Sequence, residues 1–175
     1  MKKITALALS LVMVLCAFCA LAEDNGKTRM GTLHVGTSFI IQSKMPEDYT
    51  YRPITSTELN LVGILSAGAG RPAVTVSIAY NEEYEGTERF NEVDEAVAEE
   101  IRDSFRETDE EVTFEDLETA YGTRLLKVAG DGFVDLYTIY KSYELEFVMT
   151  GGALTDADVQ MLVDFISDMD FVAEE

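Results

Sequence analysis

The sequence predicts an α+β protein, an α/β/α sandwich with one mainly antiparallel sheet and two principal helices. Three features indicate this class. Residues 133–140 form a run of β-branched and aromatic residues that is apolar on both faces, as in a central strand. Residues 144–150 alternate between apolar and polar positions, which is typical of a half-buried antiparallel neighbour. Two stretches, residues 88–106 and 155–168, repeat apolar residues at helical spacing.

The first 22 residues have the features of an export signal. Lys2 and Lys3 precede an apolar run that ends in a small-x-small pattern, so we expect cleavage between Ala22 and Glu23. Both cysteines lie inside this segment, and neither follows the small residue that lipidation requires. We therefore expect a protein that is secreted or lies on the exterior of the cell envelope, without a disulfide, a lipid anchor or a stable membrane span.

The remaining chain predicts one domain. Residues 23–31 are polar and predict a flexible mature N-terminus, and residues 32–175 have the length of a single domain. Residues 32–42 predict the first strand, with a bend at the glycine within it. Residues 49–55 predict a second, short strand at an edge of the sheet, because Pro53 lacks a backbone N–H to donate.

A hairpin, a long helix and a meander follow. Glycines split the apolar stretch of residues 59–80 into two strands. The helix expected at residues 88–106 has one apolar stripe and one acidic face. After it, residues 112–114 and 123–129 predict strands, whereas residues 115–122 fit no single type of element. From these patterns we expect a buried core that includes Val97, Ile101, Leu136, Phe147, Leu162 and Ile166.

The acidic face of the first helix places like charges three to five residues apart, at Glu92, Glu95, Glu99, Glu100 and Asp103. Without neutralising partners, the pKa values of these carboxyls would be raised in the folded state. Stability would then rise as the pH falls from 7 toward about 5. The opposite trend would indicate structural ion pairs with Arg89, Arg102 or Arg106.

The charge of the chain limits its partners. With 33 acidic and 13 basic residues the net charge is −20, and loss of the signal segment, which holds two lysines and no acid, makes it −22. Such a charge argues against binding to nucleic acid or anionic lipid and favours a monomer. Basic proteins, polyamines and divalent cations are electrostatically suited as partners, although solubility outside the cell is itself a sufficient reason for the charge.

No residue pattern indicates an enzyme, a cofactor or a metal site. His34 is the only histidine, and no nucleophile elbow accompanies it. Residues 81–92 have the spacing of a calcium-binding EF-hand loop, but glutamate replaces the usual Asp or Asn at two positions, and a strand precedes the segment. Carboxylate pairs that could hydrolyse glycosides are too numerous to single out one, and tryptophan, the usual sugar platform, is absent.

Tyrosines offer a candidate partner-binding surface. Tyr49, Tyr51 and Tyr143 combine apolar area with a polar tip, as interface residues do. The alternative is that the tyrosines, with Tyr137 and Tyr140 among them, belong to the core of the sheet.

The order of elements, with a hairpin before a long helix and a meander running into a C-terminal helix, resembles the PsbP-like family. Residues 145–152, LEFVMTGG, and the following Leu154-Thr155-Asp156 look like the closing segment of exported PsbP-like proteins of anaerobic bacteria. The resemblance covers about residues 36–171, assigns no site residue, and implies a small α/β/α sandwich that acts by binding other proteins.

We therefore expect an exported, non-enzymatic binding or accessory domain that recognises a protein through its sheet edge or its tyrosine-bearing end. The alternatives are a carboxylate-based hydrolase and a divalent-cation-binding surface protein.

Overall fold

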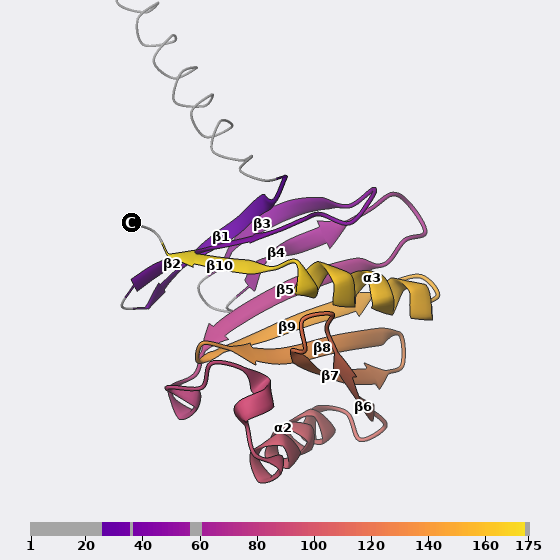
Figure 1. Ribbon diagram of the computed structural model, residues 1–175. Helices are drawn as coiled ribbons and strands as arrows, with labels where there is room; N and C mark the ends of the chain where they lie inside the picture. The colour runs from indigo at the N-terminus through magenta and orange to yellow at the C-terminus, as the bar shows by residue number, and fades with distance from the viewer. Residues whose placement is uncertain (1–25, 36, 57–60, 174–175) are drawn as a thin grey trace, which may run out of the picture.

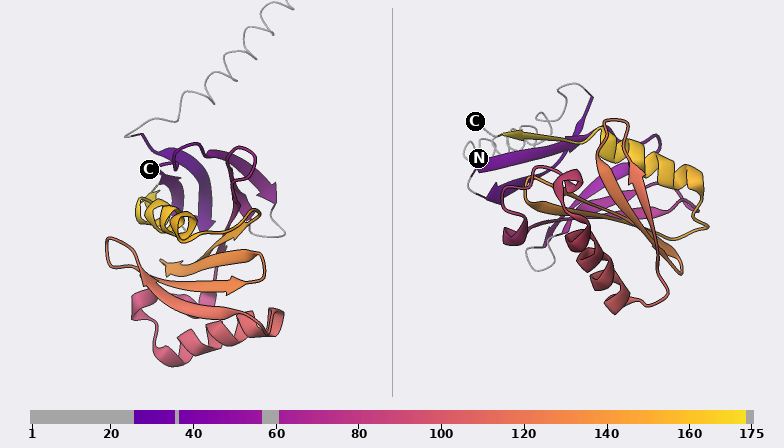
Figure 2. Two further views of the ribbon diagram at one scale, coloured as in Figure 1. Left: turned by 90° about the vertical axis from the view of Figure 1, so that its right-hand side faces the viewer. Right: turned by 60° about the horizontal axis from the view of Figure 1, so that its bottom comes forward.

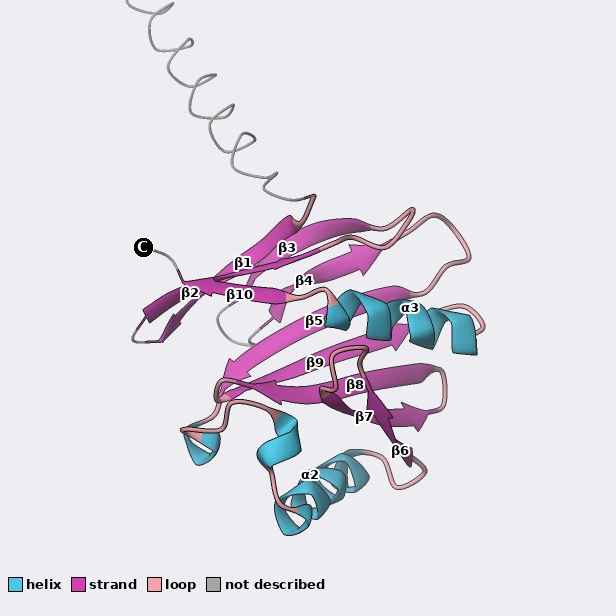
Figure 3. Cartoon of the chain, viewed as in Figure 1, coloured by secondary structure: helices cyan, strands magenta, loops and turns pink. Residues whose placement is uncertain are grey.

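The computed structural model describes residues 26–35, 37–56 and 61–173. The expected signal segment, with its cleavage site between Ala22 and Glu23, lies outside the described residues. The described chain forms two antiparallel sheets and two α-helices (Figures 1 and 3). The α+β class is confirmed, and a second, smaller sheet accompanies the one that the sequence predicts.

The larger sheet has seven strands, all paired antiparallel. Across the sheet the order is β3 (Thr50–Ser56), β4 (Leu61–Ser66), β5 (Ala73–Tyr80), β9 (Tyr143–Thr150), β8 (Phe133–Tyr140), β7 (Arg124–Gly130) and β6 (Thr113–Glu118). The predicted interior position of β8 and its antiparallel pairing with β9 are confirmed. Burial of both faces of β8 explains why its sequence is nearly continuous in apolar residues.

One helix covers each face of this sheet (Figures 1 and 2). Helix α3 (Asp156–Ser167) begins at Thr155, whose side chain and Asp158 form the predicted capping box. Helix α2 (Glu95–Thr108) begins seven residues later than predicted. Its N-cap is Asp94, which accepts bonds from two backbone N–H groups, whereas residues 90–92 form a separate 3₁₀ turn. Phe90 in this turn and Val93 after it have the same spacing as the apolar residues of α2. The sequence pattern therefore did not show that the helix begins only after Asp94.

The smaller sheet joins the two ends of the described chain (Figure 1). It contains β1 (Thr28–Val35), β2 (Thr37–Ser43) and β10 (Asp170–Ala173), in the order β1-β2-β10. The single strand expected at residues 32–42 is thus a hairpin, and the first strand already starts at Thr28, within the segment expected to be flexible. Strand β10 was not predicted, because four residues carry too little periodicity. The expected bend at Gly36 lies outside the described residues.

Two apolar clusters, one under each helix, form the core. Alternation along β8 assigns Leu136 to the cluster under α3 and Tyr137 to the cluster under α2. Five of the six predicted core residues are buried, namely Ile101, Leu136, Phe147, Leu162 and Ile166. Val97 is only half-buried, because Ala98 and Ile101 form the part of α2 that faces the sheet.

Candidate protein-binding edge

Strand β6 is the outer strand at one end of the large sheet. Among the described residues it pairs with β7 alone, so its other side carries unpaired backbone N–H and C=O groups. Its side chains are exposed or half-buried along its whole length. The opposite end of the sheet is protected differently: edge strand β3 contains Pro53, and β1 packs beside it. Within the described residues, β6 therefore offers a backbone edge that is unpaired along its length.

The sequence of β6 is acidic, which is unusual for a strand. Basic residues of the neighbouring elements compensate for this. The carboxylate of Glu115 pairs with the Lys127 Nζ of β7 at 2.8 Å. Asp116 pairs with the Arg124 Nε of β7 at 2.8 Å and with a guanidinium nitrogen of Arg102 on α2 at 3.3 Å. The hydrogen bond from Arg124 and the two positive charges lower the pKa of Asp116.

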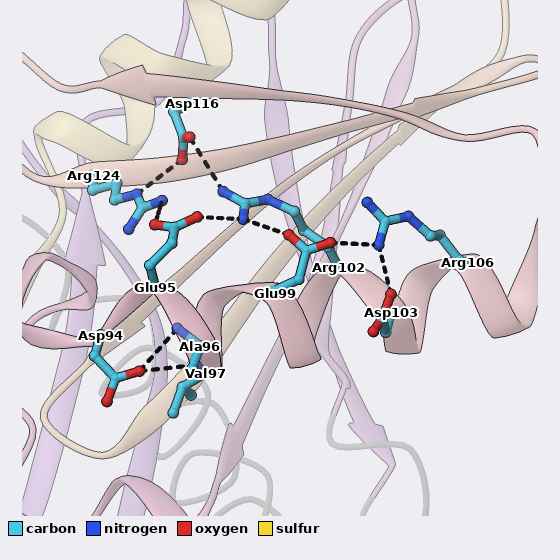
Figure 4. Close-up of polar contacts among 10 residues, drawn as sticks. All are labelled: Asp94, Glu95, Ala96, Val97, Glu99, Arg102, Asp103, Arg106, Asp116 and Arg124. Atoms are coloured by element: carbon cyan, nitrogen blue, oxygen red, sulfur yellow. Dashed lines mark hydrogen bonds and ion pairs between the residues drawn. The ribbon is translucent and has the colours of Figure 1, made fainter.

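A network of ion pairs continues from Asp116 along α2 (Figure 4). Arg102 contacts Glu95 at 2.6 Å and Glu99 at 3.0 Å, and Arg124 also reaches Glu95. Arg106 pairs with Glu99 and with Asp103. Hydrogen bonds from these arginines lower the pKa values of Glu95 and Glu99.

The expectation of an unneutralised acidic helix was wrong for these residues, because α2 and β7 supply three arginines to its carboxylates. Each lowered pKa contributes stability that is present at neutral pH and is lost as the pH falls through the folded-state value. Two further acids of this face, Glu92 and Glu100, make no ion pair within the described residues. The network fixes α2 against the edge of the sheet.

Shallow grooves flank β6 on both faces of the sheet. On the α3 side a groove of about 320 Å³ combines three apolar side chains with polar ones; it is lined by Leu117, Val159, Val163, Glu115, Glu118, Lys127, Asp156 and Gln160. On the α2 side the groove has a volume of about 410 Å³ and is polar; Asp116, Glu118 and Arg124 line it together with Asn91 and Leu117. Because side chains alternate along a strand, an added strand would direct its residues into the two grooves in turn.

The tyrosines predicted as a binding surface lie elsewhere. Tyr49 and Tyr143 are 5% and 4% exposed and belong to the core under α3, so the expectation of a binding surface was wrong for both. Tyr51 is half-buried: its ring packs on Gly63 where no Cβ would fit, and its hydroxyl donates to the carbonyl of Met30. The alternative reading of these side chains as sheet core describes them better.

The structure also describes the other segments that the sequence singled out. Residues 81–92 contain two short 3₁₀ turns, and the Asn81 side chain caps the first of them by accepting from the Glu83 N–H. Within residues 26–35, 37–56 and 61–173, no group of three or more histidine, cysteine, aspartate or glutamate side chains is placed to hold a metal ion. His34 lies on β1, away from the edge formed by β6.

The edge itself was missed by sequence reasoning, which assigned residues 112–114 to a strand and left residues 115–122 unassigned. A signal was present in the alternation of Thr113, Glu115 and Leu117 with Phe114 and Asp116. Basic residues at the matching positions of the next strand, Arg124 and Lys127, complete that signal.

The fold and the edge define the chain as a small α+β domain whose described strands leave the edge at β6 open. No family model matches it, and no curated protein matches it. Among solved structures it is similar to the solution structure of cyanobacterial PsbP from Synechocystis sp. PCC 6803, with 10% sequence identity and a TM-score of 0.49. The match covers 87% of this chain and 96% of that chain.

Proposed function

We propose that this protein is a non-enzymatic binding domain that recognises a protein partner by adding one of the partner's strands to β6. The observation that carries the proposal is the open edge of the large sheet, flanked by grooves on both faces. Strand addition obtains affinity from main-chain hydrogen bonds and specificity from the pockets that receive alternate side chains.

The partner segment is extended and alternates between apolar and basic residues. Its apolar side chains lie on the α3 side against Leu117, Val159 and Val163. Its basic side chains lie on the α2 side near Asp116 and Glu118. Glu118 makes no ion pair within the described part of the chain, and the net charge of −20 attracts a basic partner during encounter.

A second copy of the same chain is a poor occupant of this edge. Antiparallel pairing of two β6 strands would bring their acidic residues close together, and like charges directly opposite each other destabilise a sheet. Acidic edges of this kind protect proteins from self-association while leaving them open to a complementary strand. We therefore expect a monomer in the absence of a partner.

The test is a titration of the ¹⁵N-labelled protein with the end-capped peptide (Val-Lys)₄, followed by NMR. We expect saturable shifts at the backbone amides of β6 and at residues of the two grooves. The peptides (Val-Thr)₄ and (Thr-Lys)₄ each remove one half of the pattern and should bind several-fold more weakly. Equal affinity for all three peptides, or shifts confined to other strands, would contradict strand addition at this edge.

Glu118→Lys and Asp131→Lys provide a matched pair of variants. Both residues are exposed and both substitutions change the net charge equally, but Asp131 lies in the turn between β7 and β8. Glu118→Lys should weaken the (Val-Lys)₄ complex by about threefold to tenfold, and Asp131→Lys should have little effect. Equal losses would mean that the peptide responds to net charge and not to the β6 edge.

We also propose that the domain acts outside the cytoplasm, because residues 1–22 have the composition of an export signal. No helix in the described part of the chain combines the length and the apolar character needed to cross a bilayer. N-terminal sequencing of protein recovered from outside the cells should begin at Glu23; a retained Met1 would refute the proposal.

A further inference from the structure

A second hollow, apart from the β6 edge, lies where both ends of the described chain meet the large sheet. It has a volume of about 350 Å³, at the small end of the range for ligand sites. It is lined by the turn between β6 and β7, by the end of β8 and by the chain from the end of α3 into β10, together with Lys27, Arg89 and Leu145. Its lining joins apolar, aromatic and charged side chains, which is the composition of a small-molecule site.

The walls of the hollow are held by contacts between distant segments. The rings of Tyr140 and Phe171 stack with their centroids 4.3 Å apart. The Lys27 Nζ donates to the backbone carbonyl of Asp168 at 2.6 Å and pairs with the Asp170 carboxylate at 2.6 Å. The backbone of Arg89 forms a bridge to Tyr140, which places the base of its side chain beside the aromatic wall. The hollow is therefore formed before any ligand arrives.

The charges in the hollow fall into one satisfied pair and two groups without an ionic partner. Lys27 and Asp170 neutralise each other. Arg89 and Asp168 also line the hollow, and neither makes an ion pair to another described residue. A simple anion would leave Asp168 without an ionic partner, and a simple cation would leave Arg89 without one. A ligand that carries both charges satisfies both side chains.

We propose that this hollow binds a small zwitterion of the free α-amino acid class, with an apolar side chain. Arg89 receives the carboxylate, for which a guanidinium offers two parallel N–H donors. Asp168 accepts from the ammonium group. The apolar side chain lies against the stacked rings of Tyr140 and Phe171 and against Leu145 and Ile166, which also line the hollow. This binding is independent of the β6 edge and goes beyond the proposed recognition of a protein.

The test compares three probes that share one ring and differ in charge. L-phenylalanine carries both charges, L-phenylalaninamide only the ammonium, and 3-phenylpropanoate only the carboxylate. We expect L-phenylalanine to produce saturable shifts in NMR spectra of the ¹⁵N-labelled protein at the amides of Thr138, Tyr140 and Phe171. Each single-charge analogue should bind about tenfold more weakly, because it leaves one charged side chain unpaired. Measurement in 0.15 M salt screens the attraction of the acidic protein for the amide.

Two variants assign the two charges. Arg89→Gln should abolish the preference for L-phenylalanine over L-phenylalaninamide, and Asp168→Asn should abolish its preference over 3-phenylpropanoate. Arg52→Gln removes an exposed arginine on β3, at the far end of the sheet, and should leave all three affinities unchanged. The proposal is overturned if no probe gives saturable shifts at these amides up to about 10 mM, a level at which even millimolar sites fill. It is equally overturned if the three probes bind alike, or if Arg89→Gln and Asp168→Asn retain the preferences.

Discussion

Replacing Asp135 by asparagine should change the free energy of unfolding in a way that depends on pH. The difference between the variant and the wild type should move in favour of the variant as the pH rises from 5 to 8. Asp135 lies on the interior strand β8 and is 3% exposed. The Phe147 N–H donates to its Oδ1 at 3.2 Å. Burial, with the negative charge of Glu146 nearby, raises the pKa of Asp135 to about 7.

The magnitude follows from linkage. An unfolded aspartate has a pKa of about 3.9, so the folded state binds the proton more tightly and ionised Asp135 destabilises it. With a folded-state value of about 7, the destabilisation is about 4 kcal/mol at pH 8, about 1.5 kcal/mol at pH 5 and about 0.5 kcal/mol at pH 4. The contribution of this residue to stability therefore rises as the pH falls from 8 toward 4.

Asp135→Asn removes this dependence, because asparagine keeps the acceptor for the Phe147 N–H but carries no charge. Its buried NH₂ group lowers stability by about 1–3 kcal/mol at every pH. The measured quantity is therefore the change of the difference between variant and wild type across the pH range. Urea unfolding at pH 8, 6.5 and 5 should show that difference shift by about 2–3 kcal/mol in favour of the variant toward pH 8.

Asp131→Asn serves as the control, because Asp131 is exposed in the turn that precedes β8. It should give a nearly constant difference from the wild type over the same range. A flat profile for Asp135→Asn, or one that favours the wild type more strongly at pH 8, would refute the assignment of a raised pKa to this buried carboxyl.

Two further predictions concern the packing and the ion pairs of the helices. Leu162→Ala should lower the free energy of unfolding by about 2–5 kcal/mol, because the side chain is fully buried. Val97→Ala, at a half-buried position, should lower it clearly less. A loss below about 1 kcal/mol for Leu162→Ala would contradict the packing of α3 on the sheet. Arg102→Gln should reduce stability at pH 7 but not near pH 2, because the lowered pKa values of Glu95 and Asp116 stabilise the fold only while those carboxyls are ionised. An Arg102→Gln loss that does not change with pH or with added salt would argue against the ion pairs.

Strong local patterns made part of the fold predictable from the sequence. Strands β8 and β9 follow from apolar runs and alternation, and α3 follows from its capping box and its stripe. Elements that depend on distant partners were not predictable. β10 is a four-residue strand whose Phe171 pairs with Ile41 of β2, far away in the chain.

The candidate site also depends on contacts between distant parts of the chain, which the sequence does not show. The composition of β6 opposes a strand, and it is the charges of Arg102, Arg124 and Lys127 that make an acidic strand tolerable. Two of these residues come from β7 and one from α2, so no window of sequence contains the reason. The preference for a sheet edge as the recognition surface came from the expected fold, but which edge is open depends on the pairing of all seven strands.

The pairing of β10 with β2 also ties the two ends of the described chain together. The bond between Lys27 and Asp170 spans 143 residues, so this contact is among the least local in the described chain. The hairpin that contains β6 joins neighbouring segments and does not depend on that contact. A chain shortened before Asp170 would keep the recognition edge but lose one wall of the hollow beside Tyr140. Such a shortened chain should therefore still bind (Val-Lys)₄ and lose its affinity for L-phenylalanine, which separates the two proposed sites.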